Sequence, residues 1–346
     1  MSQLRAGVYA RPMPSTEWRE TVAPDEDERF GRHARTLREV QAASARDGRP
    51  ARALHAKGLV GATAELEILG DLPAHARHGI FAAPATYRGW ARFSNGAPRR
   101  QHDKKGDVRG LALKLVGVDG DKVLSGAVEP RTQDFLAIQS SATPFRDPDE
   151  FVAFVRAAAS PATLLFKLGF AIGFGRTFTI LRRLAGGEAT KPVSSLAATR
   201  FFSALPIQVG PYAARYAFTP RQAAGGAASG ADADYLGKDI AGRLREGALV
   251  WDMQLQFFED EGTTPIEDAS VDWASPYVTV GTLTLPRQDV TSEEGREVAA
   301  KIERLAFDPW HARAEHKPLG AMMRARKHAY YESTQGRDAL PEPTEP

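Results

Sequence analysis

The sequence predicts an α+β fold in which an antiparallel β-barrel forms the core and helices are inserted between and after its strands. Short stretches with alternating apolar and polar residues follow one another in two blocks, separated by turns rich in Gly, Pro and Asp. Segments with a helical period lie between and after these blocks, without the regular strand–helix–strand alternation of a parallel sheet. The 346 residues are enough to bury a substantial core.

The first strand block follows an N-terminal arm and a helix. Residues 1–28 are rich in Pro, Glu and Arg, which is typical of an extended arm, and Phe30–Arg46 has a helical period with few breakers. Alternation then predicts strands, with turn signals such as Asn95-Gly96 between them. The expected strands are Ala62–Leu69, Thr86–Ser94, Arg109–Val116, Lys122–Ser125 and Asp134–Ile138.

The second block is preceded by helices and followed by two more. The small-residue stretch Gln222–Asp234 is expected to be a flexible loop within one domain that spans residues 29–337, with a flexible tail at 338–346. The expected helices are Glu150–Ala159, Ala162–Leu184, Glu294–Ala306 and Ala321–Arg337. The expected strands are Phe201–Gly210, Tyr212–Thr219, Ala248–Phe258 and Tyr277–Leu285.

The composition excludes several classes of protein. The chain has no Cys, which removes disulfides, thiolate nucleophiles and Cys-ligated metal centres and fits a reducing compartment. A formal net charge of +2 gives no reason to expect a nucleic-acid partner. The apolar stretch Leu164–Leu181 is interrupted by Lys167 and Arg176, so we expect an amphipathic helix in the core or an interface, and no transmembrane segment. With no signal-peptide pattern at the N-terminus, a cytoplasmic location is expected.

Two short patterns carry candidate chemistry. In Arg52–Gly58, His55 suits proton transfer near neutral pH and Arg52 suits binding of an anionic group. In the last expected helix, a spacing of i, i+4, i+7 and i+11 places one stripe of side chains on a single face. The residues alone favour His55 as a packed structural side chain over a proton shuttle, and the stripe as a solvated helix face over an anion or metal site. The stripe consists of Arg326, Tyr330, Ser333 and Arg337.

Taken together, motifs from about residue 45 to residue 337 resemble the catalase superfamily, specifically its small catalase-like haem proteins, which lack the extra C-terminal domain. The motifs occur in the family's order along the chain. They are Arg52–Gly58, Trp90–Ser94, Gly106–Lys114, Asp134–Gln139, Phe145–Asp147 with Phe151, Thr264–Asp268, Pro276–Val280, His316–Gly320 and Arg326–Arg337.

The resemblance implies a haem b cofactor and a role for each matching residue. His55 would be the proton shuttle on the distal side, oriented by Ser94, and Gln139 would be the distal amide. On the other side, Tyr330 would bind the iron as a phenolate kept ionised by Arg326. The residues expected to hold the porphyrin are Arg52, Arg92 and Arg337 at the propionates and Phe151 on the ring.

The activity that the resemblance implies is that of a haem-dependent peroxidase or catalase, active in the oxidative stress response. Catalases carry Asn where this chain has Gln139, and usually a smaller Val where it has Leu54, and these departures argue against fast disproportionation of hydrogen peroxide. We expect the apolar stretch Leu164–Leu181 to border a wider channel, so that organic hydroperoxides are preferred over hydrogen peroxide, with an organic electron donor. Two alternatives stay open: an allene oxide synthase-like rearrangement of fatty-acid hydroperoxides, and a non-catalytic haem-binding sensor. The family resemblance also suggests a homodimer.

Overall fold

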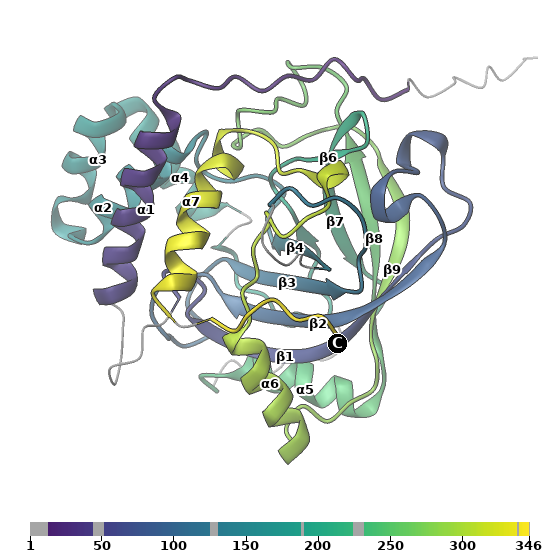
Figure 1. Cartoon of the computed structure of the whole chain (residues 1–346). Coiled ribbons are helices and arrows are strands. Elements are labelled where there is room, and N and C mark those ends of the chain that lie inside the picture. The colour runs from purple at the N-terminus through teal and green to yellow at the C-terminus, as the bar shows by residue number, and fades with distance from the viewer. Residues whose placement is uncertain are drawn as a thin grey trace, which may run out of the picture.

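The strands of the chain form one antiparallel sheet in the order β5-β4-β3-β2-β1-β9-β8-β7-β6 (Figure 1). The computed structural model describes residues 13–43, 52–124, 131–187, 190–223, 232–337 and 339–345. The strands are β1 (Lys57–Ile68), β2 (Ala85–Asn95), β3 (Arg109–Val116), β4 (Thr132–Ile138), β5 (Phe201–Phe202), β6 (Ile207–Val209), β7 (Tyr212–Pro220), β8 (Leu249–Phe257) and β9 (Tyr277–Leu285).

The sheet closes into a barrel because the short strand β5 pairs with both β4 and β7. Strand β6 is attached outside this ring as a hairpin with β7. Alternate residues point into the barrel and form one large apolar cluster, in which the largest buried side chains include Phe93, Phe135, Tyr216 and Trp251. The interior is therefore a packed core, and the expected barrel-centred α+β class is confirmed.

Helices cover two sides of the barrel (Figure 1). Helices α5 and α6 pack against β1, while α1 and α7 pack against each other and α2, α3 and α4 form an insertion between β4 and β5. The helices are α1 (Glu26–Ala43), α2 (Pro148–Ala158), α3 (Leu164–Ile172), α4 (Phe174–Gly186), α5 (Tyr235–Glu246), α6 (Glu293–Arg304) and α7 (Ala321–Gln335).

Most predicted elements occur with ends shifted by a few residues, but two expectations about the insertion are wrong. The single helix expected over Ala162–Leu184 is split into α3 and α4 at Gly173, whose φ of +86° breaks the helical path. Of the core or interface location expected for this stretch, the core is contradicted, because Leu168 and Ile180 are buried but several of its Phe side chains face solvent.

Three other expectations need correction. The strand expected at Lys122–Ser125 is an isolated bridge between Lys122 and Arg313, with Ser125 outside the described residues. The strand expected over Phe201–Gly210 is interrupted between β5 and β6, where Ala204 has a φ of +55°. Helix α5 was not expected, although Leu236, Ile240 and Leu244 have helical spacing and are buried.

The described part of the N-terminal arm runs along the molecule and ends in α1, which begins at Glu26 rather than Phe30. Glu20 and Glu26 from this part, together with Glu267, form ion pairs with the guanidinium of Arg324 at the start of α7. The three carboxylates raise the pKa of Arg324 even though burial alone would lower it. These ion pairs fix α7 against the arm. Among the described helices, none is long and apolar enough to cross a membrane.

Candidate functional site

One end of the barrel brings together segments that are far apart in the sequence. His55 lies two residues before β1, next to the end of β2. Ser94 of β2 pairs with Gly58 on one side and with Gly110 of β3 on the other. The register between β1 and β2 shifts between Gly58 and Val60, an irregularity of the kind that re-aims side chains beside functional sites.

The imidazole of His55 is held in one orientation. Its Nδ1 lies 2.9 Å from Oγ of Ser94. The backbone of His55 has a φ of +54°, which is uncommon for a residue other than Gly, and it is fixed on both sides. Its N–H donates to the carbonyl of Gly96 at 2.9 Å, and its carbonyl accepts from Arg92 Nη2 at 3.0 Å. A Cβ on Gly110 would lie 2.7 Å from Cε1 of the His55 imidazole and clash with it, so a larger residue at position 110 would displace the ring.

His55 is uncharged at neutral pH in this environment. Burial lowers its pKa to about 3, and the positive charges of Arg92, Arg326 and Arg52 act in the same direction. A neutral imidazole can accept a proton, which a protonated one cannot.

Three arginines from separate parts of the chain meet beside His55. Arg92 binds the carboxylate of Glu303 with Nε and Nη2, at 3.0 and 3.2 Å. Arg52 and Arg337 each donate from Nη2 to the carbonyl of Leu305 at 2.9 Å. The sequence placed all three arginines in one site, and the structure brings them together. Glu303, at the end of α6, was not predicted as a member.

This arginine group (Arg52, Arg92 and Arg337) carries more positive charge than its surroundings neutralise. Three guanidinium groups share the single carboxylate of Glu303. Burial, followed by the charge of Arg92, lowers the pKa of Arg337 to about 10 and that of Arg52 well below its usual value. The buried Nε atoms of Arg52 and Arg337 have no hydrogen-bond partner. Such a group suits further carboxylates, which guanidinium groups bind in pairs of hydrogen bonds.

The predicted stripe on α7 contains a tyrosine–arginine pair. Nη2 of Arg326 donates to the phenol oxygen of Tyr330 at 2.8 Å, and the guanidinium lies 5.1 Å from the ring centroid. Although burial alone would lower it, Tyr330 raises the pKa of Arg326.

The His55 region and the α7 pair lie within electrostatic reach of each other. The charge of Arg326 contributes to the low pKa of His55, and Tyr330 acts on the pKa of Arg52. The structure therefore brings the predicted proton shuttle, the predicted metal ligand and the arginine group into one region, at one end of the barrel and facing α7.

Two predicted residues have different surroundings. Nε2 of Gln139 donates to the carbonyl of Lys191 at 3.1 Å, and Oε1 accepts from the backbone N–H of Arg109 at 3.2 Å. Gln139 also lines a cavity of about 460 Å³ whose wall continues through residues 191–195. Phe151, near the start of α2, packs edge-on against Phe145 with 5.4 Å between the ring centroids. The roles expected for Gln139 and Phe151 stay predictions.

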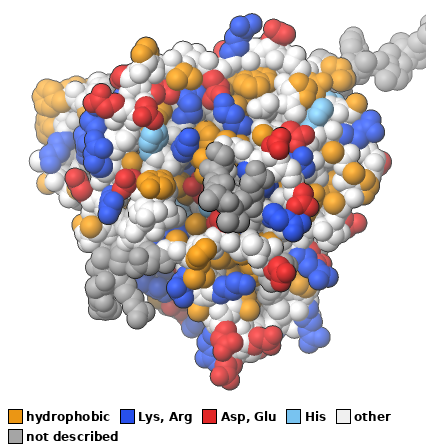
Figure 2. All heavy atoms as spheres, in the orientation of Figure 1, with side chains coloured by type: hydrophobic (Ala, Val, Ile, Leu, Met, Phe, Trp, Pro, Cys, Tyr) orange, Lys and Arg blue, Asp and Glu red, His pale blue; other side chains and the backbone are white. Residues whose placement is uncertain are grey.

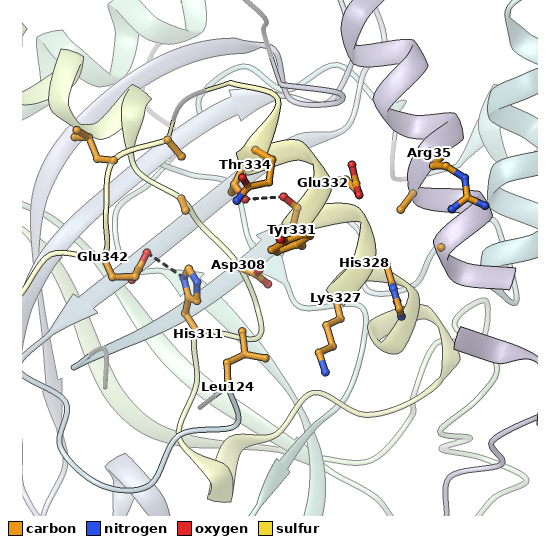
Figure 3. A pocket seen from close by; sticks show the side chains of 16 residues that line it. Arg35, Leu124, Asp308, His311, Lys327, His328, Tyr331, Glu332, Thr334 and Glu342 are labelled. Carbon is orange, nitrogen blue, oxygen red and sulfur yellow. Dashed lines mark hydrogen bonds and ion pairs between the residues drawn. The ribbon is translucent and has the colours of Figure 1, made fainter. Parts of the chain in front are cut away.

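A buried polar network on another face of α7 was missed by the sequence analysis (Figure 3). Nζ of Lys114 binds Asp134 and Glu342 at 2.8 and 2.7 Å, and His311 lies 3.2 Å from Glu342. The backbone N–H of Asp308 donates to Asp134 at 2.9 Å. The network borders a cavity of about 440 Å³ between α1, α7 and the C-terminal segment. Its members are up to 228 residues apart in the sequence, so no local sequence pattern predicts the network.

Replacing Asp308 with Asn is expected to stabilise the protein at pH 7.5 and not at pH 4. Burial raises the pKa of Asp308 from 3.8 to about 6, so above pH 6 the folded state holds a poorly solvated charge. Below pH 3.8 the carboxyl is neutral in both the folded and the unfolded state, and the penalty disappears. The shift corresponds to at most about 3 kcal/mol. Urea unfolding of Asp308→Asn across this pH range, with the exposed Asp71→Asn as control, checks the expectation; a gain that does not change with pH contradicts it.

Comparison with known proteins gives relatives in both sequence and fold. The chain is 26% identical over 275 residues to a catalase-related peroxidase of Mycolicibacterium paratuberculosis, covering 75% of this chain and 79% of that protein. No protein-family model matches the chain.

Solved structures of catalases share the fold. A bacterial catalase has a TM-score of 0.64 at 21% identity and covers 96% of this chain, and a fungal catalase has a TM-score of 0.66 at 19% identity over 87%. Catalase A from Saccharomyces cerevisiae has a TM-score of 0.67 at 16% identity over 96%. The chain spans 62–69% of the length of these three catalases. The chain is therefore similar in sequence to a catalase-related peroxidase and has the fold of the catalases.

Proposed function

We propose that this protein is a haem-dependent, catalase-like peroxidase that acts on hydrogen peroxide and preferentially on organic hydroperoxides, with an organic electron donor. The observation that carries the proposal is the pairing of a neutral, partly buried His55 with an Arg326-bound Tyr330 in one region. The name of the mycobacterial relative, catalase-related peroxidase, supports the same class of reaction.

The residues present fit a haem. A haem brings two carboxylates and an iron, and the arginine group has excess positive charge and two buried Nε atoms without partners. Arg52, Arg92 and Arg337 would bind the propionates, and Tyr330 would bind the iron through its phenol oxygen while Arg326 holds it ionised. When bound, the haem would supply the redox chemistry, giving the two electrons that cleave the peroxide bond and regaining them from the organic donor.

The chain itself supplies the proton transfer. In the tautomer whose Nδ1 donates to Oγ of Ser94, the lone pair of His55 is on Nε2, where it can accept the proton of a hydroperoxide. The same Nε2 then returns the proton to the departing oxygen, so that the base becomes the acid. The low pKa of His55 keeps Nε2 ready to accept a proton throughout the neutral range.

A preference for organic hydroperoxides is supported by the surroundings of Gln139. Its amide is engaged by the backbone at both ends, and it lines an open cavity of about 460 Å³ with room for an organic substituent, although His55 does not line that cavity. The homodimer and the cytoplasmic location stay predictions.

Steady-state assays of the haem-loaded protein test the proposal. We expect a phenolic donor to be oxidised when cumene hydroperoxide or a fatty-acid hydroperoxide is the oxidant. The kcat/KM for either organic hydroperoxide should exceed the kcat/KM for hydrogen peroxide. The fatty-acid hydroperoxide should be converted into the corresponding alcohol. Turnover no better than that of an equal amount of free haem would contradict the peroxidase assignment. An epoxide or its ketol, formed without a donor, would show a rearrangement without net redox instead.

A further inference from the structure

The inserted helices α3 and α4 expose an unusual number of large apolar side chains. Eight large apolar side chains in the described ranges are strongly exposed, and five of these lie between residues 165 and 178. Phe170 is the most exposed, with 82% of its surface in contact with solvent. A contiguous exposed apolar patch of this kind marks an interaction surface. This aromatic patch consists of Leu165, Phe166, Phe170, Phe174 and Phe178.

The two helices are arranged so that the exposed side chains form one surface. The chain turns at Gly173, and the rings of Phe170 and Phe174 meet across this turn with 5.8 Å between their centroids. On α4, Phe174, Phe178 and Arg182 are four residues apart and lie on one face. Figure 2 shows apolar side chains at the edge of the molecule where α3 lies in Figure 1, next to basic ones.

The opposite face of the α3–α4 helical hairpin packs against the rest of the protein and holds the two helices in place. Leu168, Thr177 and Ile180 are completely buried, and Arg176 forms an ion pair with the buried Glu150. The aromatic patch is therefore not needed to hold the two helices on the barrel.

The charged side chains around the aromatic patch are all positive. Residues 151–187 contain five Arg or Lys and no Asp or Glu. Arg176 and Arg183 turn inward, to Glu150 and to the carbonyl of Ser270, whereas Lys167 and Arg182 are exposed beside the aromatic side chains. Aromatic residues flanked by basic ones are the pattern of helices that lie in the interface of an anionic membrane.

We propose that the α3–α4 hairpin docks the protein on anionic lipid bilayers, with the aromatic patch in the interfacial region and Lys167 and Arg182 at the lipid phosphates. A second copy of the chain is a poorer partner, because a symmetric contact would place the same positive charges against each other. Insertion is shallow, since the nine residues of α3 extend only about 14 Å, half of what spanning requires. The inference does not depend on the bound haem or on the proposed activity.

Vesicle co-sedimentation of the full-length protein tests the proposal. We expect binding to vesicles of phosphatidylcholine mixed with phosphatidylglycerol and at least about tenfold weaker binding to phosphatidylcholine alone. The variant Phe170→Ser with Phe178→Ser should bind the mixed vesicles at least about tenfold less tightly. Lys167→Ser with Arg182→Ser should lose the preference for anionic lipid and the sensitivity to salt.

Matched controls lie elsewhere on the surface. Val22→Ser removes another strongly exposed apolar side chain, and Lys104→Ser with Lys105→Ser removes two exposed positive charges. Both controls should bind as the wild type does. Because the chain has no Cys, a solvent-sensitive dye on Phe170→Cys reports insertion directly, with Val22→Cys as the labelled control.

The proposal is contradicted if wild type and Phe170→Ser/Phe178→Ser bind the mixed vesicles equally, or if the dye at position 170 shows no blue shift. A wild-type dimer that becomes a monomer in this double variant, without vesicle binding by either, would assign the aromatic patch to self-association instead. Peroxide turnover in the absence of lipid should be the same in the wild type and the double variant, so the two proposals fail separately.

Discussion

Replacing Tyr330 with Phe is expected to weaken haem binding by about 100-fold or more. The change removes the phenol oxygen and leaves the ring and its packing in place. It also leaves the partly buried guanidinium of Arg326 without the group 2.8 Å away that it binds, so the site keeps a positive charge with no phenolate to match it. Titration of ferric haem into the two proteins, followed by the absorption of the bound haem, measures the change.

A neighbouring tyrosine provides the control for this prediction. Tyr331 is 63% exposed and points away from Arg326, into the cavity on the other face of α7. Tyr331→Phe should bind haem as the wild type does, and circular dichroism should show both variants folded. Equal haem affinity in Tyr330→Phe and the wild type would remove Tyr330 from the metal site.

Replacing His55 with Gln is expected to lower kcat/KM for hydroperoxides by about 10²–10⁴-fold, the usual contribution of a positioned acid–base group. Gln retains polarity at this position but cannot accept and return the proton. Because the pKa of His55 is about 3, the wild-type rate should stay level from pH 8 down to pH 5, with no decline near the usual histidine pKa of 6.5. Steady-state rates across this pH range check both statements.

Ser94→Ala separates proton transfer by His55 from its orientation. Loss of the 2.9 Å contact with Nδ1 frees the ring but leaves Nε2 able to accept a proton, so we expect a loss of about tenfold, smaller than for His55→Gln. If haem affinity is retained but turnover by His55→Gln equals that of the wild type, His55 is not the proton shuttle.

The barrel could be predicted from the sequence because its strands have a local signature. Arg109–Val116 and Tyr277–Leu285 alternate clearly and form β3 and β9 with the expected ends. The insertion could not, since the apolar run 164–181 reads as one helix and only the backbone of Gly173 shows where α3 ends. Helix α5 was overlooked because the low-complexity stretch before it hides its start, although its buried face has regular spacing.

The site was predictable to the extent that short motifs encode it. His55 with Ser94, and Arg326 with Tyr330, are near neighbours in the structure as expected from their motifs. Glu303 was missed because its partner Arg92 is 211 residues away, and nothing in α6 distinguishes this acid from the other acidic residues of the helix. Asp308 was missed for the same reason, since burial by distant segments sets its pKa.

The resonance Raman spectrum of the haem-loaded protein tests the central claim most directly. If Tyr330 binds the iron of a haem held by the arginine group, the spectrum contains vibrations of an iron-bound phenolate, and these are absent from Tyr330→Phe. A wild-type spectrum without phenolate vibrations, or one that Tyr330→Phe reproduces unchanged, would contradict the claim.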